Sequence, residues 1–317
     1  MMMRPSGRAT LRALFAASAL ALAVGGAALI AGPAGAQTVA PTASALPDVA
    51  FRNDRLSVEV IGAGPDVLLI PGYASSREVW RPLAQRLSAN HRVHLVQLSG
   101  FAGEPWSHGD GPFLVPAIAA LAAYVEGAGL QRPAIIGHSM GGLSALLLAQ
   151  TRPELVGRIM SVDSLPFFSA LYGPQVTAEA ARPFADQAAA GILAADDEAF
   201  RLGQGQNALG LARDPGVRAA MVDWSMASDR RALGTAIADV MTTDARPGLS
   251  AMSTPVWAVY ATDADGGPPP AMAEALWTRE WAGVPDLTLV RVDGARHFIM
   301  ADQPARFDAV VDQFLAD

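Results

Sequence analysis

The sequence predicts an α/β fold: a mostly parallel central sheet flanked by helices, with a helical insertion between two of its strands. Two observations lead to this prediction. Short, fully apolar segments bounded by turn residues alternate with longer segments whose apolar residues recur at helical spacing, a pattern typical of parallel sheets wrapped by helices. The chain has 317 residues, which suits one large domain of this class, or a core with an insertion, better than several small domains.

The first half of the chain shows the alternation most clearly. Residues 55–61 alternate between apolar and polar residues like a half-buried strand, and turn residues follow at 62–65. Residues 67–70 are fully apolar between turns, as expected for a strand buried on both faces. The same criteria predict further strands at 93–98, 134–136 and 158–162, and helices at 79–87, 114–125 and 143–149.

The alternation breaks after Asp163. Between residues 165 and 250 we recognise no apolar strand, and the segment is helical in character. The alternation then resumes, with strands predicted at 256–260 and 287–292 and helices at 275–281 and 307–315. We therefore predict one α/β core, formed by residues 51–164 and 251–317, that carries residues 165–250 as a helical lid or cap.

The first 36 residues have the three parts of a signal peptide. These parts are a basic start, an apolar run and a small-x-small cleavage pattern: Arg4, Arg8 and Arg12, then residues 13–30, then Ala34-Gly35-Ala36. We expect cleavage before Gln37, export to the periplasm or the medium, and no stable membrane insertion afterwards. The alternative is an uncleaved anchor, because the run is about long enough to cross a bilayer. Residues 37–50 are expected to form a flexible lead-in.

Two missing residue types exclude whole chemistries. All 23 cationic residues are arginine, and the chain contains no cysteine. Lysine Schiff bases, Ser-Lys dyads, P-loop lysines, thiolate nucleophiles and cysteine metal sites are therefore excluded. Removing the three arginines of the signal peptide from the net charge of −7 leaves the mature chain near −10, which argues against nucleic acid or an anionic membrane surface as a partner. We expect a small-molecule substrate and no cofactor or metal.

The segment Gly137-His138-Ser139-Met140-Gly141 matches the pattern Gly-x-Ser-x-Gly. A predicted strand precedes it and a predicted helix follows, which is the context in which this motif presents a nucleophilic serine on a sharp turn. Small residues two positions to either side allow neighbouring backbone to come close. The N-terminus of the following helix favours negative charge beside the serine. These features predict that Ser139 is a nucleophile.

On this motif and its flanks, the chain resembles the α/β-hydrolases of the esterase and lipase superfamily over nearly all of residues 55–317. Pro71-Gly72-Tyr73 stands where the family usually has His-Gly-x, so that Pro71 replaces the histidine while the glycine remains. The resemblance implies an oxyanion hole made by the backbone N–H groups of Tyr73 and Met140, since the change at position 71 leaves both donors in place. The Tyr73 phenol is expected either near the cavity or packed under the lid.

The resemblance also implies which histidine is the general base. The five histidines are His91, His94, His108, His138 and His297. The first two lie in or beside a strand, His108 lies in a polar loop, and the ring of His138 should point away from the adjoining nucleophile. His297 follows the last predicted strand, where the family keeps its catalytic histidine, and it gives the chain order serine, acid, histidine.

The carboxylate that would orient His297 has three candidates. The family usually places it just after the strand that follows the lid, where Asp263 and Asp265 both stand. Asp163, at the end of the strand before the lid, occupies a position that some relatives use. We choose Asp263 and keep Asp265 and Asp163 as alternatives, because the choice rests on placement alone.

The sequence therefore predicts an exported carboxylic ester hydrolase with the triad Ser139, His297 and Asp263. Lactonase, amidase, perhydrolase and carbon–carbon bond hydrolase are alternatives on the same fold, and a non-catalytic binding protein is an alternative of another class. Apolar residues of the lid suggest an apolar substrate pocket, which Trp106 and His108 could also reach. The lid residues are Phe167, Phe168, Leu171, Met221, Trp224 and Met226.

Overall fold

The computed structural model describes residues 50–266 and 269–316. The predicted signal peptide and, apart from residue 50, the lead-in lie outside the described residues. Within those ranges, no helix combines the length and the apolar character that crossing a membrane requires.

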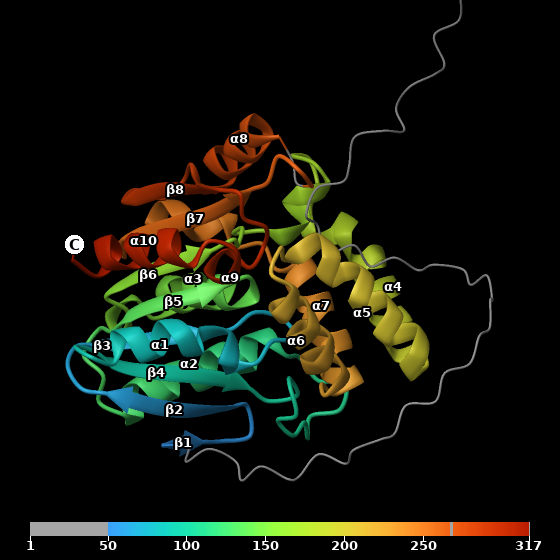
Figure 1. Ribbon diagram of the computed structural model, residues 1–317, viewed down its shortest axis with the longest axis horizontal. Helices are drawn as coiled ribbons and strands as arrows, with labels where there is room; N and C mark the ends of the chain where they lie inside the picture. Colours follow the sequence, from blue (N-terminus) through green and yellow to red (C-terminus); the bar gives the residue numbers. More distant parts are fainter. Residues whose placement is uncertain (1–49, 267–268, 317) are drawn as a thin grey trace, which may run out of the picture.

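An eight-stranded sheet runs through the molecule, with the spatial order β1-β2-β4-β3-β5-β6-β7-β8 (Figure 1). The pairs β1–β2 and β2–β4 are antiparallel, and the remaining pairs, from β4–β3 to β7–β8, are parallel. The strands are β1 (Phe51–Arg52), β2 (Leu56–Gly62), β3 (Asp66–Ile70), β4 (Arg92–Leu98), β5 (Ala134–His138), β6 (Arg158–Val162), β7 (Val256–Thr262) and β8 (Leu287–Asp293). The predicted mostly parallel sheet is confirmed, and the two-residue β1 is the one strand not predicted.

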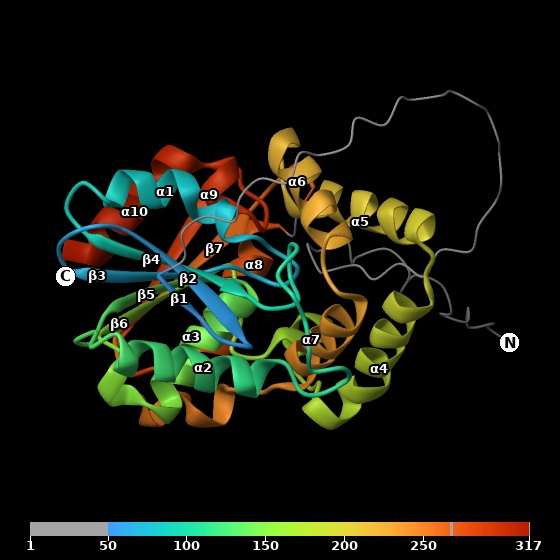
Figure 2. The ribbon, with the colours of Figure 1, turned by 90° about the horizontal axis from the view of Figure 1, so that it is seen from below.

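Helices cover both faces of the sheet. Figure 2 shows α1, α9 and α10 on one face and α2 and α3 on the other. The helices of the core are α1 (Arg81–Leu87), α2 (Leu114–Gly127), α3 (Met140–Thr151), α8 (Pro270–Trp281), α9 (Ile299–Asp302) and α10 (Pro304–Ala316). The predicted α/β class is thus confirmed.

The sheet separates two hydrophobic clusters. Leu121 of α2, Leu143 of α3 and Trp277 of α8 belong to the cluster on one face. Leu83 of α1 and Phe307 of α10 belong to the cluster on the other. Strands β3 to β6 are mostly buried, and in β3 and β5 this burial on both faces goes with short apolar runs, residues 67–70 and 134–136.

Four helices and no strand of the sheet occupy the region between β6 and β7: α4 (Ala178–Ala194), α5 (Asp197–Leu211), α6 (Pro215–Met226) and α7 (Arg230–Thr242). They stand together beyond one end of the strands, at the right of Figure 1. The two ends of this helical insertion are joined, because Phe167 and Asp244 form an isolated β-bridge and the Ala245 amide donates to the Pro166 carbonyl at 2.9 Å. The insertion therefore leaves and re-enters the core at one place.

Candidate active site

Ser139 stands on a strained turn between β5 and α3. Its backbone has φ 53° and ψ −122°, a conformation that residues with a side chain rarely adopt. The structure holds this turn in place, since the Ser139 amide donates to the Val162 carbonyl at 2.9 Å and the Ser139 carbonyl accepts from Gly142 at 2.8 Å. In this conformation the serine precedes the helix and lines the cavities at the end of the sheet.

Two glycines make this turn possible by allowing close backbone approach. A Cβ on Gly137 would lie 2.2 Å from the Gly141 carbonyl oxygen, which no side chain can tolerate. A Cβ on Gly72 would lie 3.0 Å from the Ser139 Cβ and 3.0 Å from the His138 Nδ1. A side chain at position 72 would therefore be crowded against Ser139 and His138, a steric restriction that is independent of the residue at position 71.

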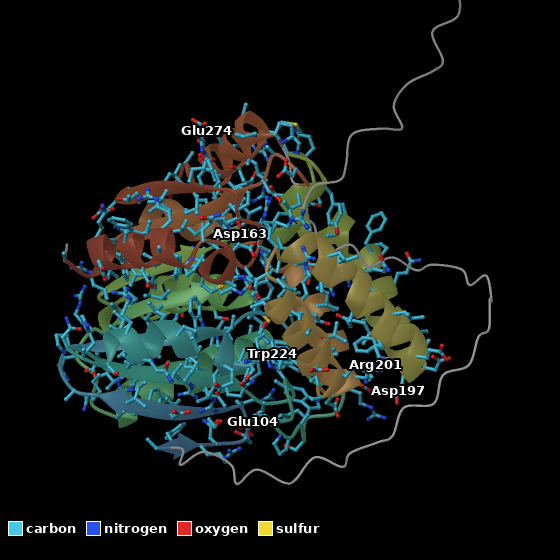
Figure 3. The ribbon with its side chains drawn as sticks, in the orientation of Figure 1. Glu104, Asp163, Asp197, Arg201, Trp224 and Glu274 are labelled. Carbon is cyan, nitrogen blue, oxygen red and sulfur yellow. The ribbon has the colours of Figure 1, made fainter. Side chains whose placement is uncertain are left out.

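The carboxylate beside His297 belongs to Asp163. His297 Nδ1 lies 2.7 Å from Asp163 Oδ2, and both side chains are nearly buried, at 13% and 8% exposure. The other oxygen of Asp163 accepts the Ala261 amide at 3.0 Å. Asp163 immediately follows β6, where it adopts φ 45°, and it lies where the sheet meets the helical insertion (Figure 3).

The choice of Asp263 as the residue that orients His297 is wrong on this geometry. Asp263 is buried, with its two oxygens taken by Arg213 at 2.6 Å and Arg296 at 2.8 Å. Burial alone would raise the pKa of Asp263, but hydrogen bonds from Arg296 and the Asp265 amide, together with the two arginine charges, lower it below its usual value. Asp265 is largely exposed and faces Arg213 at 3.4 Å. Neither acid is paired with the histidine.

Asp263 instead helps to hold the His297 loop against the insertion. Arg296 precedes His297, and Arg213 lies between α5 and α6. Asp302 reinforces this junction, since its oxygens accept the amides of Arg213 at 2.7 Å and Arg296 at 2.8 Å. The acid that sequence reasoning assigned to catalysis is thus part of an ion-pair cluster that joins the insertion to the histidine loop.

His138 contacts His297 rather than pointing away from the site. The two ring centroids lie 4.4 Å apart, and the His138 Nε2 lies 3.0 Å from the His297 carbonyl oxygen. This bond requires a proton on Nε2, which leaves Nδ1 as a buried acceptor without a partner among the described residues. Burial, followed by the neighbouring His297 ring, holds the pKa of His138 well below its usual value. A neutral imidazole therefore packs against the His297 ring and donates to its backbone carbonyl.

The other three histidines are engaged elsewhere. His94 is buried between the Tyr124 hydroxyl at 2.6 Å and Asp66 at 2.9 Å. His91 contacts Asn90, and His108 contacts the Asp54 carbonyl oxygen at 3.0 Å. None of the three lines either cavity that contains Ser139.

The backbone amides of Tyr73 and Met140 have no acceptor among the described residues. Each residue lines a cavity that also contains Ser139. The Tyr73 side chain packs edge-on against Phe101, and its hydroxyl donates to the Leu233 carbonyl of α7 at 3.2 Å. The phenol therefore packs under the insertion and borders the cavity at the same time, and its burial raises its pKa.

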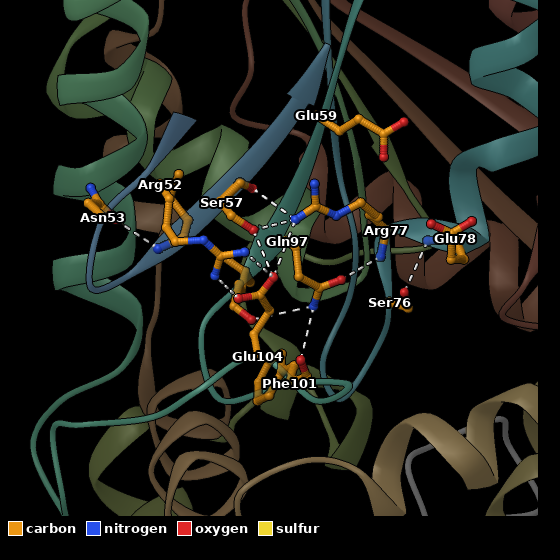
Figure 4. Close-up of polar contacts among 12 residues, drawn as sticks. Arg52, Asn53, Ser57, Glu59, Ser76, Arg77, Glu78, Gln97, Phe101 and Glu104 are labelled. Carbon is orange, nitrogen blue, oxygen red and sulfur yellow. Dashed lines mark hydrogen bonds and ion pairs between the residues drawn. The ribbon is translucent and has the colours of Figure 1, made fainter. Parts of the chain in front are cut away.

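A buried polar network fixes the loop that carries Tyr73. Gln97 of β4 accepts the Arg77 amide at 2.7 Å and donates to the Ser75 carbonyl at 3.2 Å. The Arg77 guanidinium in turn contacts Ser57 and Glu104 (Figure 4). The segment that follows Tyr73 is thus tied to strands β2 and β4 of the sheet.

Two cavities meet at Ser139 and His297. The first lies under the insertion and has polar and apolar walls, with a volume of about 580 Å³ including its open mouth. The second, of about 470 Å³ on the same measure, is mostly apolar and reaches Phe168, Leu171 and Trp277. No hydrogen bond joins Ser139 to His297 among the described contacts, although catalytic hydrogen bonds are often long before substrate binds.

The predicted pocket residues divide between these cavities and the core. Phe168 and Leu171 line the second cavity and Met221 lines the first. Phe167, Trp224 and Met226 line neither: Phe167 is fully buried beneath the Arg246 guanidinium, and Trp224 and Met226 pack against the hydrophobic clusters. Trp106 also stays outside, since its indole N–H donates to the Gly109 carbonyl within its own loop.

Comparison with known proteins places the fold in a family. Residues 67–310 match the model of the alpha/beta hydrolase family. The chain belongs to this family. Among curated proteins, the pimeloyl-acyl-carrier protein methyl ester esterase of Aeromonas salmonicida is 39% identical over 115 residues, which are 36% of this chain and 44% of the relative. The matched part thus spans less than half of that relative.

Solved structures show the same fold over much more of the chain. A hydrolase from Pseudomonas aeruginosa superimposes with a TM-score of 0.69 at 20% identity, covering 86% of this chain and 99% of the other. The enol-lactonase from Burkholderia xenovorans gives a TM-score of 0.67 at 18% identity, covering 83% and 96%. At such identities the likeness concerns the fold alone.

Proposed function

We propose that this protein is a serine hydrolase that cleaves carboxylic esters, with Ser139 as nucleophile, His297 as general base and Asp163 as the orienting carboxylate. The observation that carries the proposal is the strained serine at the end of β5, which shares its cavities with a histidine paired to a carboxylate. A structural serine would have no need of this backbone strain.

The geometry supports a two-step acyl transfer. Ser139 Oγ attacks the ester carbonyl carbon while its proton passes to His297 Nε2, and the amides of Tyr73 and Met140 stabilise the oxyanion. The carbon–oxygen bond of the ester then breaks, and the departing alcohol takes the proton from His297. Water, deprotonated by His297, attacks the acyl-enzyme in the same way and releases the acid and Ser139.

Asp163 is suited to its proposed role by its two contacts. The Ala261 amide occupies Oδ1, so that Oδ2 faces His297 Nδ1 in one fixed orientation. A carboxylate there requires the proton on Nδ1 and leaves Nε2 free to accept the serine proton.

The relatives favour an ester over other acyl substrates. The similar curated proteins are methyl ester esterases, and the matched family is one of hydrolases. The mostly apolar second cavity suits a small or medium apolar group on one side of the scissile bond.

Hydrolysis of p-nitrophenyl esters of graded chain length tests this proposal. We expect turnover of the short esters by the wild-type enzyme and its loss in Ser139→Ala, with Ser144→Ala as a control, because Ser144 is a buried serine of the same helix whose hydroxyl donates to the Met140 carbonyl. Wild-type protein that is folded and hydrolyses none of these esters would contradict the proposal.

We also propose that the protein is exported and that residues 1–36 are removed. The supporting evidence is the basic start, the apolar run and the small-residue pattern of the sequence. N-terminal analysis of protein from the periplasm and the medium should give a chain that begins at Gln37. Full-length protein confined to the cytoplasm would refute export.

A further inference from the structure

We infer that Gln204 and Asn207 are specificity-determining residues, which select an ester that carries an uncharged hydrogen-bonding group, such as an amide, on one of its two arms. This inference rests on the proposed function and narrows it to a substrate class. It starts from the side chains that line the two cavities meeting at Ser139.

Both amide side chains line the first cavity from α5. They are three residues apart, so they lie on one face of the helix. Each is partly buried, and neither side chain has a hydrogen-bond partner among the residues that the structure describes. A partly buried amide that bonds to nothing in its own chain retains its donors and its acceptor for another molecule.

Ser225 of α6 adds a third neutral polar group to the same wall. Its residue is 5% exposed, and its hydroxyl makes no hydrogen bond within the described chain. Tyr73, Ser139 and His297 line the same cavity. A substrate arm that extends from the nucleophile under the insertion therefore meets three unengaged hydrogen-bonding groups.

The second cavity offers a different environment. Apart from Ser164, Ser139 and the His297–Asp163 pair, its lining residues are apolar: Met140, Leu143, Leu165, Phe168, Leu171, Val240 and Trp277. Besides Ser139, this cavity offers a substrate the hydroxyl of Ser164 and no side-chain amide. The two cavities thus differ in their side-chain amides, because Gln204 and Asn207 line the first and no amide side chain lines the second.

Charge restricts the polar arm further. The residues lining the first cavity include no arginine, aspartate or glutamate, and its titratable members are Tyr73, His138 and His297. A carboxylate or ammonium group in this cavity would be desolvated without an opposite charge. Amide, hydroxyl and carbonyl groups are satisfied by the primary amides, which both donate and accept. The selected arm is therefore polar and neutral.

The experiment compares matched esters that differ in one amide. In the first pair, the p-nitrophenyl esters of N-acetylglycine and pentanoic acid differ by an amide in the acyl arm. In the second pair, 2-acetamidoethyl and pentyl butyrate differ by an amide in the alcohol arm. We expect the wild-type enzyme to prefer the amide-bearing member of at least one pair by roughly tenfold in kcat/KM, the effect of one or two good hydrogen bonds.

Variants assign this preference to its residues. Gln204→Leu and Asn207→Leu should each reduce the preference severalfold, because each replaces an amide that can form hydrogen bonds by an apolar side chain. Gln206→Leu is the matched control, since Gln206 is an exposed amide of the same helix that lines neither cavity. It should retain the wild-type preference.

Two results would overturn the inference, and they are distinguishable. Wild-type enzyme that hydrolyses these esters without preference in either pair, or with a preference that survives both variants, contradicts the role of Gln204 and Asn207 and leaves the proposed function standing. Wild-type enzyme that hydrolyses none of the four esters contradicts the proposed function and the inference together.

Discussion

Replacing Asp163 by asparagine should nearly abolish catalysis and leave the fold intact. The reason lies in the two contacts of the carboxylate. Its Oδ1 accepts the Ala261 amide at 3.0 Å and its Oδ2 faces His297 Nδ1 at 2.7 Å. In Asp163→Asn, the oxygen of the new amide must stay with Ala261, because an NH₂ group there would oppose an N–H donor. The NH₂ group therefore faces His297.

The size of the effect follows from the tautomer that this NH₂ group selects. A donor opposite Nδ1 requires the unprotonated nitrogen there, so the proton moves to Nε2, which then cannot accept the serine proton. Asparagine at this position of the Ser-His-Asp triad of other hydrolases lowers kcat about 10⁴-fold. We expect a similar loss, equivalent to about 5.5 kcal/mol in the barrier.

Asp263→Asn is the matched comparison. This variant weakens the ion pairs to Arg213 and Arg296, the first of which is substantially exposed, so we expect about 1–2 kcal/mol of lost stability. Its kcat should remain within about tenfold of wild type. The assay is kcat on p-nitrophenyl butyrate beside urea unfolding of both variants. If Asp263→Asn lost 10⁴-fold and Asp163→Asn stayed active, the assignment of the acid would be refuted.

Three further predictions concern the surroundings of the site. Gly72→Ala places a methyl group 3.0 Å from the Ser139 Cβ, which should displace the Tyr73 loop and reduce kcat about 100-fold; unchanged kcat would show that the loop adjusts freely. His138 has its pKa lowered below the usual 6.5, so protonation favours the unfolded chain and wild-type stability should fall as the pH drops from 7 to 5. The stability of His138→Phe should not show this dependence. If the free energies of unfolding of the two proteins, measured in urea, changed equally between pH 7 and 5, the buried neutral state of His138 would be contradicted. Gly203→Ala should stabilise α5 by about 1 kcal/mol and raise Tm by about 2 °C, because a Cβ there meets nothing within 4 Å; a lower Tm would show a contact that this helix does not have in the structure.

Much of the fold could be predicted because the local patterns have direct physical causes. The run 67–70 lies in a strand buried on both faces, and apolar residues are the ones that tolerate such burial. The two-residue β1 has too few residues to form a pattern. Element ends differed by a few residues, as with α8, which begins at Pro270 rather than near residue 275.

The nucleophile is a local feature of the sequence, whereas the partner of the histidine is not. Strands β6 and β7 are parallel neighbours, so the acids that follow them, Asp163 and Asp263, reach the same edge of the sheet. Their order along the chain cannot tell which one contacts His297. The sequence did contain one clue. Arg296 adjoins His297 and needs an acid of its own as partner, which in the structure is Asp263. The contact of His138 with His297 depends on packing between residues 159 positions apart, which no local pattern encodes.

The most direct test of the account is to locate the adduct of a fluorophosphonate probe by peptide mass spectrometry. We predict one phosphonylated residue, Ser139, formed at similar rates in wild type and Asp263→Asn and far more slowly in Asp163→Asn. Folded wild-type protein that remains unlabelled, or that carries the adduct on a different serine, would contradict the central claim.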